Sequence, residues 1–106
     1  MAPPSYEVRL APAAARAFRK LPDGVAARVR AAVKRQAEAA ARGSHGKRGG
    51  KTLKSVRGRS DRFFRLRVGE HRVMYDVLDD ERALLVLGIV HRRDLERWLR
   101  GGAPGR

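Results

Sequence analysis

Residues 64–75 read Phe-Arg-Leu-Arg-Val-Gly-Glu-His-Arg-Val-Met-Tyr, and this stretch decides the fold. Apolar residues alternate with basic ones on either side of Gly-Glu, which is typical of a β-hairpin. Gly69 supplies the positive φ that a type II′ turn needs first, so the turn sets the register of two strands over 63–68 and 71–78. The expected cross-strand pairs are Val68 with His71, Arg67 with Arg72, Arg65 with Met74 and Phe63 with Asp76.

Three arginines gather on one face of this hairpin. Opposed residues share a face of a sheet, so Arg65, Arg67 and Arg72 converge. The opposite, core face holds Phe64, Leu66, Val73, Tyr75 and Val77. Arg67 opposite Arg72 disfavours folding because like charges repel across a strand pair, and such conflicts occur at functional sites. The cluster indicates an anionic ligand; the alternative is the solvated sheet face of an arginine-rich protein.

The upstream part of the chain predicts one strand and two helices. Residues 5–10 alternate, which predicts a half-buried strand with Tyr6, Val8 and Leu10 on one face. Pro12 is tolerated at the first position of the helix that follows. Asp23, beside Pro22 and Gly24, is expected to cap a second helix. The apolar stripe of that second helix is Val29, Ala32, Val33 and Ala37.

Downstream, the pattern completes an α+β domain. Residues 43–50 indicate a basic, glycine-rich loop, and 79–81 form a polar turn. Residues 83–90 are almost continuously apolar, as a central strand covered on both faces should be. Residues 94–100 predict a short final helix whose apolar residues are Leu95, Trp98 and Leu99. The order is β-α-α-β-β-β-α in one domain over 1–106, with its core at about 5–100 and flexible termini.

The charge balance indicates a polyanionic or acidic partner. The 106 residues hold 25 Lys+Arg against 11 Asp+Glu, a formal charge of +14. Such a surplus repels itself, and nucleic acid is the first candidate to offset it. The absence of cysteine excludes disulfides, no apolar stretch approaches the length of a membrane span, and no secretion signal is visible. We therefore expect a cytoplasmic protein that does not bind a membrane.

A second basic segment follows the central strand. His91-Arg92-Arg93 comes directly after Val90, where it can reach the hairpin arginines. A histidine beside arginines and a phosphate is a plausible proton carrier, and it is equally compatible with a packing or capping role. His45 and His71 show no metal-ligand spacing with His91, so we predict no metal and no cofactor.

The sequence resembles a known toxin family. Residues 64–75 resemble the aromatic-R-L-R-V-G-x-x-R-V-x-Y hairpin of RelE-type toxins of the RelE/ParE superfamily. His91-Arg92-Arg93-Asp94 is similar to the H-R-R-(D/E) ending of that family, and Lys51-Thr52-Leu53-Lys54 fits upstream. The resemblance covers about residues 5–100. It implies a mostly antiparallel four-stranded sheet packed on a helical hairpin.

The resemblance also implies the toxin of a type II toxin–antitoxin system, a ribosome-dependent mRNA endonuclease in which a ribose 2′-OH attacks the neighbouring phosphate. The implied partners are a cognate antitoxin, the ribosome and mRNA, and operator DNA reached through the antitoxin. The residues expected to act in catalysis are Arg65, Arg67, Arg72, His91 and Arg92. The residues expected to bind RNA are Lys47, Arg48, Lys51, Lys54 and Arg93.

One departure from the family pattern leaves alternatives open. Many members use a tyrosine of the final helix for proton transfer, whereas this chain has Glu96 and Trp98 at the two corresponding positions. Glu96 or His91 can transfer a proton, and Trp98 either packs the helix or stacks on a base. Two other functions remain: a ParE-like inhibitor of DNA gyrase, which lacks the basic cleft, and a non-catalytic module that binds nucleic acid or the ribosome.

Overall fold

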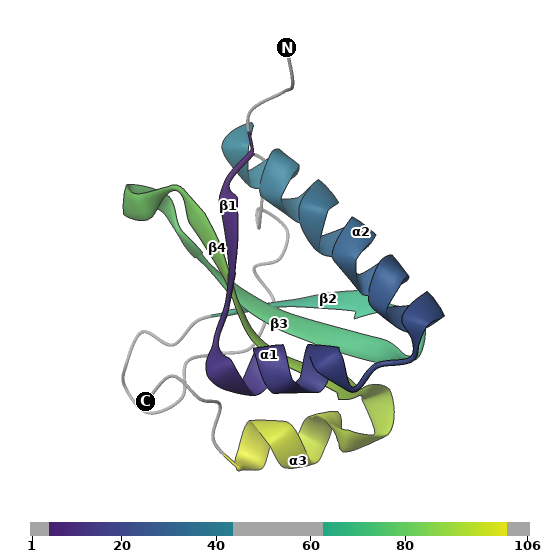
Figure 1. Ribbon diagram of the computed structural model, residues 1–106. Helices are drawn as coiled ribbons and strands as arrows, with labels where there is room; N and C mark the ends of the chain where they lie inside the picture. Colours follow the sequence, from purple (N-terminus) through teal and green to yellow (C-terminus); the bar gives the residue numbers. More distant parts are fainter. Residues whose placement is uncertain (1–4, 44–62, 102–106) are drawn as a thin grey trace.

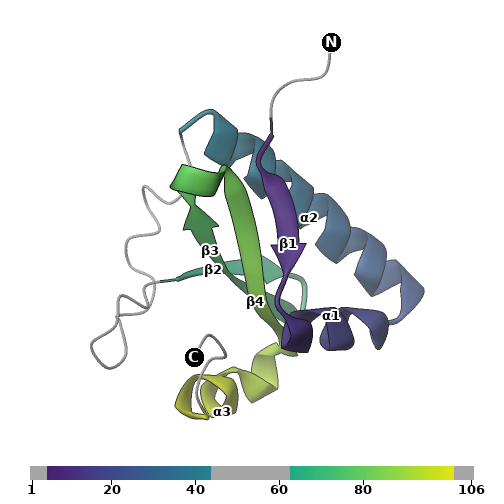
Figure 2. The same ribbon diagram turned by 60° about the vertical axis from the view of Figure 1, so that its left-hand side comes forward.

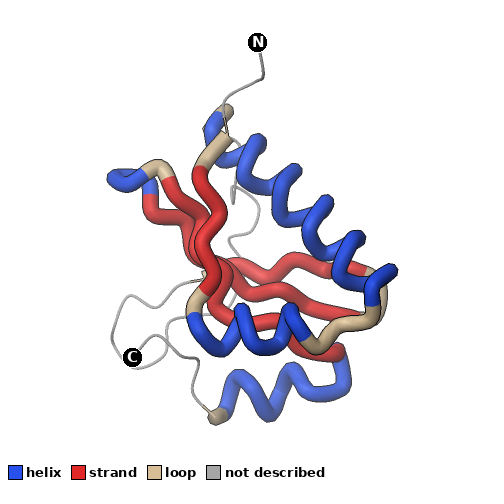
Figure 3. Tube along the Cα trace, in the orientation of Figure 1, coloured by secondary structure: helices blue, strands red, loops and turns tan. Residues whose placement is uncertain are grey.

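The computed structural model describes residues 5–43 and 63–101. Its elements follow the predicted order β-α-α-β-β-β-α, with two short 3₁₀ turns added (Figure 1). The bounds are β1 Glu7–Leu10, α1 Pro12–Arg19, α2 Asp23–Ala41, β2 Phe64–Val68, β3 His71–Leu78, η2 Asp79–Glu81, β4 Ala83–His91, η3 Arg92–Asp94 and α3 Leu95–Arg100. The predicted α+β fold is confirmed, and α1 and α3 both lie near one end of the sheet (Figure 3).

The four strands form one mixed sheet in the order β1-β4-β3-β2. β2 pairs with β3 and β3 with β4 in the antiparallel sense, whereas β1 pairs with β4 in parallel. The parallel pair follows from the connection, because the chain leaves β1 through two helices and returns to β4 only after the hairpin. Figure 2 shows β1 as the outer strand beside β4.

The helical hairpin of α1 and α2 covers one face of the sheet. The predicted stripe of α2, which comprises Val29, Ala32, Val33 and Ala37, is buried. It packs on the strand residues Val73, Tyr75, Leu84, Val86 and Ile89, with Phe64, Leu66 and Val77 partly buried against them. This is the core face predicted for the hairpin. The Tyr75 hydroxyl also donates a hydrogen bond of 2.9 Å to Gln36 Oε1, which links β3 to α2.

Two upstream predictions need correction. Tyr6 is buried, but Val8 and Leu10 are 41% and 42% exposed, because β1 is an edge strand and only Tyr6 reaches under α2, where its N–H donates to Ala37 O at 3.1 Å. Asp23 does not cap α2: it is the first helical residue, Pro22 holds the N-cap position, and no side chain caps the helix. At that position the Asp23 carboxylate still complements the helix dipole.

β4 packs against a core on each face of the sheet, and a β-bulge shifts the alternation of its side chains. Met74 pairs with Gly88 but Tyr75 pairs with Val86, so Leu87 has no partner in the ladder. The extra residue resets the alternation of side chains. Leu85 and Leu87 face the second core, on the far face of the sheet, by ordinary alternation, and after the bulge Ile89 lies again on the face that the helical hairpin covers.

The final helix α3 covers the far face of the sheet at one end. Leu95, Trp98 and Leu99 pack against a second core of Phe63, Met74 and Leu87. The Trp98 ring lies directly on Gly88, where an added Cβ would be 2.7 Å from ring atoms, and stands edge-on to Phe63 at 5.7 Å between centroids. Of the two roles left open for Trp98, the structure therefore shows packing. The helix begins at Leu95, because residues 92–94 form a 3₁₀ turn instead.

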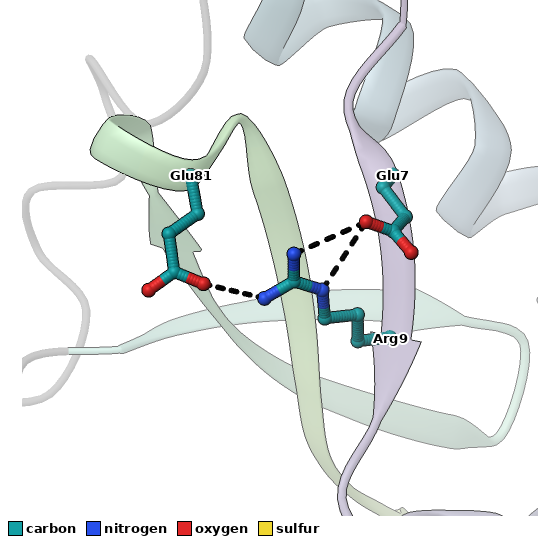
Figure 4. Close-up of polar contacts among 3 residues, drawn as sticks. All are labelled: Glu7, Arg9 and Glu81. Atoms are coloured by element: carbon teal, nitrogen blue, oxygen red, sulfur yellow. Dashed lines mark hydrogen bonds and ion pairs between the residues drawn. The ribbon is translucent and has the colours of Figure 1, made fainter.

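A charged cluster fastens β1 to the turn between β3 and β4 (Figure 4). Arg9 Nη1 contacts Glu81 Oε1 at 2.6 Å, and its Nη2 contacts Glu7 Oε1 at 3.1 Å. The Tyr6 hydroxyl donates to Asp79 Oδ1 at 2.8 Å, and this hydrogen bond raises the pKa of Tyr6. These contacts lie on the strand ends remote from the hairpin turn, so they leave the arginine face free.

Candidate functional site

An open pocket of about 710 Å³ lies where the hairpin, the end of β4 and the start of α3 meet. Its lining residues come from all three elements: Arg65, Arg67, Arg72, His91, Arg92, Arg93 and Leu95. Five of these seven are arginines, and within the described part of the chain no acidic residue lines the pocket. Every position predicted to act in catalysis therefore reaches one hollow, together with Arg93.

The hairpin register places its three arginines as expected. Arg67 lies opposite Arg72, and Arg65 lies opposite Met74. Gly69 has a φ of +59°, which confirms the positive φ assigned to the first turn residue. A one-residue slip would have sent these guanidinium groups to the helical face, so the turn decides the site.

Arg72 is held by the turn that precedes it. Its Nη1 donates hydrogen bonds to Gly69 O at 3.0 Å and to His71 O at 2.9 Å. A guanidinium carries five N–H donors, so the other nitrogens stay available for an anion. The carbonyl partners also offset part of the repulsion that Arg72 meets from Arg67 across the strand pair.

Arg92 is held by the other residue of the same turn. Its backbone N–H donates to Glu70 O at 2.7 Å, and its Nε contacts Glu70 Oε1 at 2.7 Å. Both side chains remain more than 60% exposed, at 61% for Arg92 and 62% for Glu70. The end of β4 is thus tied to the hairpin turn by backbone and side chain together.

Two histidines face each other beside these arginines. His71 and His91 are cross-strand partners in β3 and β4, with ring centroids 5.4 Å apart and the rings edge-to-face. His91 Nδ1 accepts a hydrogen bond from the Arg93 backbone N–H at 3.2 Å. The neutral His91 ring therefore carries its proton on Nε2. This arrangement supplies the capping role that the sequence left open for His91, without removing Nε2 from use.

The pKa of His71 lies below its ordinary value. Burial is the largest cause, followed by the charges of His91 and Arg28, and Glu70 opposes the shift. At neutral pH His71 is therefore uncharged. It adds no positive charge to the arginines beside it.

Several predicted residues lie outside the described parts of the chain: Lys47, Arg48, Lys51 and Lys54. Two residues of the site were missed by sequence reasoning. Glu70 was assigned to the turn alone, and Leu95 to helix packing. No local signal reveals either role, because each depends on where the end of β4 meets the hairpin.

A protein-family model settles what kind of protein carries this pocket. The model, described as the ParE toxin of the type II toxin–antitoxin system parDE, matches residues 8–96. The chain belongs to the RelE/ParE toxin family. The predicted membership is thereby confirmed, and the toxin is one component of a type II toxin–antitoxin system. The matched range includes the hairpin, Arg92 and Leu95, so the pocket lies within the family domain.

The structure of the toxin is similar to solved structures of RelE proteins. It matches a chain of the RelBE2 toxin–antitoxin complex from Mycobacterium tuberculosis at 26% identity and a TM-score of 0.60, covering 84% of this chain and 100% of that chain. It matches the intact Escherichia coli RelBE complex at 20% identity and a TM-score of 0.57, covering 82% and 96%. The RelE–RelB complex from Pyrococcus horikoshii matches at 19% identity and a TM-score of 0.55, covering 84% and 97%.

The two matches of lower identity show a shared fold. No curated protein sequence matches the toxin. Across residues 5–43 and 63–101, none of the helices is long and apolar enough to cross a membrane. Over the same two ranges, no three His, Asp or Glu side chains are grouped as a metal ion would require.

Proposed function

We propose that this toxin is an endoribonuclease that cuts mRNA on the ribosome without a metal ion. The observation that carries the proposal is the pocket, whose arginines come from the two hairpin strands and from η3, the turn that follows β4. A concave site with this charge favours a phosphodiester backbone. Arginine suits such a substrate because its planar fork binds two phosphoryl oxygens at once.

The proposed reaction is an internal displacement in the RNA. Water takes the proton of the ribose 2′-OH, the 2′ oxygen attacks the adjacent phosphorus, and the bond from phosphorus to the 5′ oxygen breaks as that oxygen gains a proton. The products are a 2′,3′-cyclic phosphate and a 5′-OH. Negative charge grows on the phosphoryl oxygens during this step, and donors held in place beforehand stabilise it. Removing one such donor costs about 10²–10³ in rate.

Arginine supplies charge but not proton transfer, since it essentially never loses its proton. His91 is the proposed donor toward the leaving 5′ oxygen, because it lines the pocket and the Arg93 N–H contacts only Nδ1. It acts in the imidazolium form, in which Nδ1 no longer accepts the Arg93 N–H, and giving up the Nε2 proton returns the ring to its neutral form. Glu96, the alternative from the sequence, is exposed on α3 and is not among the lining residues. We therefore assign the proton-transfer role to His91.

A cell-free translation reaction followed by primer extension tests this function. The toxin is expected to produce cuts at fixed codon positions that disappear when ribosomes are omitted. Arg65→Ala should weaken the cuts by about 10²–10³. Arg19→Ala is the matched control, because Arg19 is exposed on α1 and does not line the pocket. Intact mRNA in the wild-type reaction contradicts the proposal.

Inhibition of DNA gyrase is the second candidate function. The family model that matches residues 8–96 is named for a ParE toxin, which favours it. Gyrase–DNA cleavage complexes that accumulate while mRNA stays intact would support this candidate. Inhibition of translation without cuts or gyrase complexes would indicate a non-catalytic ribosome-binding module, whose affinity falls steeply with salt.

We further propose that a cognate antitoxin with an acidic, amphipathic segment neutralises this toxin, and that operator DNA is contacted through that antitoxin. The three solved complexes named above each pair a RelE-type protein with its antitoxin. Here the +14 charge and the exposed Val8 and Leu10 on β1 suit an acidic segment with apolar contacts. Co-purification with the product of the adjacent reading frame tests this; failure to form a complex contradicts it.

A further inference from the structure

The hairpin turn makes two contacts with Arg92, and both come from Glu70. The carbonyl oxygen of Glu70 accepts the Arg92 backbone N–H at 2.7 Å, and the carboxylate contacts Arg92 Nε at 2.7 Å. The first contact fixes where the chain leaves β4. The second fixes the direction of the guanidinium, because Nε is the nitrogen closest to the side-chain stem.

The side of the guanidinium that Glu70 uses matters. Arg92 lines the pocket, whereas Glu70 is not among the lining residues. The carboxylate occupies Nε of Arg92, so this nitrogen is already paired when an anion enters the pocket. Because Nε is occupied, the edge formed by Nη1 and Nη2 is the one left to bind two oxygens of one phosphate.

The same short segment, from Gly69 to His71, also holds Arg72 through Gly69 O and His71 O. Two guanidinium groups of the pocket thus depend on one short segment. We propose that Glu70 is a positioning residue, which orients Arg92 so that its Nη edge faces the scissile phosphate. This inference rests on the proposed nuclease function, and it assigns no contact between Glu70 and the RNA.

The ion pair is too exposed to be explained by folding. Pairs between exposed side chains contribute about 0–1 kcal/mol to stability, because water screens them and ordering long side chains costs entropy. Holding a side chain in place matters more at a reaction centre, where a misplacement of about 1 Å can lower the rate by about 10²-fold. Loss of Glu70 should therefore change the rate of cutting far more than the stability.

The competing explanation is that Glu70 is an internal anion that RNA must displace from Arg92. The two explanations predict opposite effects of Glu70→Ala on the cutting rate. A displaced anion weakens RNA binding, so both Glu70→Gln and Glu70→Ala should tighten binding and speed cutting. A positioning carboxylate can be replaced by the amide oxygen of glutamine, which still accepts the Nε–H, but not by alanine.

The test measures cutting rate and RNA affinity for the full chain and five variants in the ribosome assay. We expect Glu70→Ala to cut about 10- to 100-fold more slowly at saturating ribosome complex, and Glu70→Gln to stay within about threefold of wild type. Arg92→Ala combined with Glu70→Ala should be no slower than Arg92→Ala alone, because both act through one group. Glu81→Gln is the control, since Glu81 makes a similar exposed pair with Arg9 outside the pocket.

A second readout does not depend on cutting. Nitrogen-15 relaxation of Arg92 Nε in the isolated toxin should show a restricted group in wild type and Glu70→Gln, and a mobile one in Glu70→Ala. Equal mobility in all three overturns the positioning role, as does full-rate cutting by Glu70→Ala. If wild type fails to cut mRNA while Arg92 Nε is restricted only when residue 70 can accept its hydrogen bond, the nuclease proposal fails and the positioning role stands.

Discussion

Gly88 is the position where one added methyl group should disturb the toxin most. A Cβ at this residue would lie 2.7 Å from three atoms of the Trp98 indole, a separation that real Cβ atoms essentially never show. The indole belongs to α3, whose first residue, Leu95, lines the arginine pocket. Gly88→Ala should therefore push α3 off the sheet and alter one wall of the pocket.

The expected loss of stability follows from two opposing effects. Inserting a methyl into a packed core costs about 1–3 kcal/mol. Replacing glycine in the unfolded chain returns about 0.4–1 kcal/mol, because Gly88 does not need a positive φ. The net loss is about 1–2 kcal/mol, which lowers the melting temperature of a domain this size by about 4–16 °C.

Gly24→Ala is the matched control. An added Cβ at Gly24 meets nothing within 4 Å, and the residue lies in the first turn of α2. This variant should leave the melting temperature unchanged or raise it by a few degrees. Thermal unfolding followed by circular dichroism compares the two proteins directly, and the ribosome assay then shows whether cutting falls at Gly88→Ala alone.

Replacing Trp98 with a smaller side chain tests whether the clash with its indole causes the loss of stability. Trp98→Leu combined with Gly88→Ala should be less destabilising than the sum of the single changes, because the clash needs both side chains. If Gly88→Ala melts at or above the wild-type temperature, α3 does not pack on the sheet as described, and the pocket wall formed by Leu95 must be placed elsewhere.

Three further changes test the hairpin. Gly69→Ala should cost about 1–2 kcal/mol in a denaturant titration, since φ is +59° there and a side chain is strained in that region; an unchanged midpoint contradicts the turn. Arg72→Ala should reduce cutting by about 10²–10³ while unfolding free energy stays within about 1 kcal/mol, because two carbonyl hydrogen bonds are lost as repulsion from Arg67 is relieved; a collapsed fold would make Arg72 structural. The lowered pKa of His71 means that the unfolded chain binds the proton more readily, so stability should be complete above about pH 6.5 and fall as pH drops through the folded pKa; His71→Gln should flatten that profile.

The sequence was sufficient for the hairpin and for the face that carries its arginines. Alternation and one glycine determine the register, and the register determines which side chains converge. The buried stripe of α2 was equally accessible, because its spacing depends only on helical geometry. These features are local, so residues close together in the chain decide them.

The remaining features depend on contacts between distant segments. Val8 and Leu10 alternate as buried residues do, yet the edge position of β1 leaves them exposed, and only the sheet order reveals this. The bulge at Leu87 is hidden within an unbroken apolar run. Glu70 looks like an ordinary turn residue until the end of β4 is placed beside it.

The chemistry of the cut ends tests the central claim most directly. Purified ribosomes carrying an end-labelled mRNA with an empty A site are incubated with wild-type toxin and with Arg65→Ala. We predict a fragment ending in a 2′,3′-cyclic phosphate with wild type, reduced by about 10²–10³ in the variant. Equal cutting by both proteins, or fragments ending in a 3′-OH, would mean that the arginine pocket does not perform the proposed reaction.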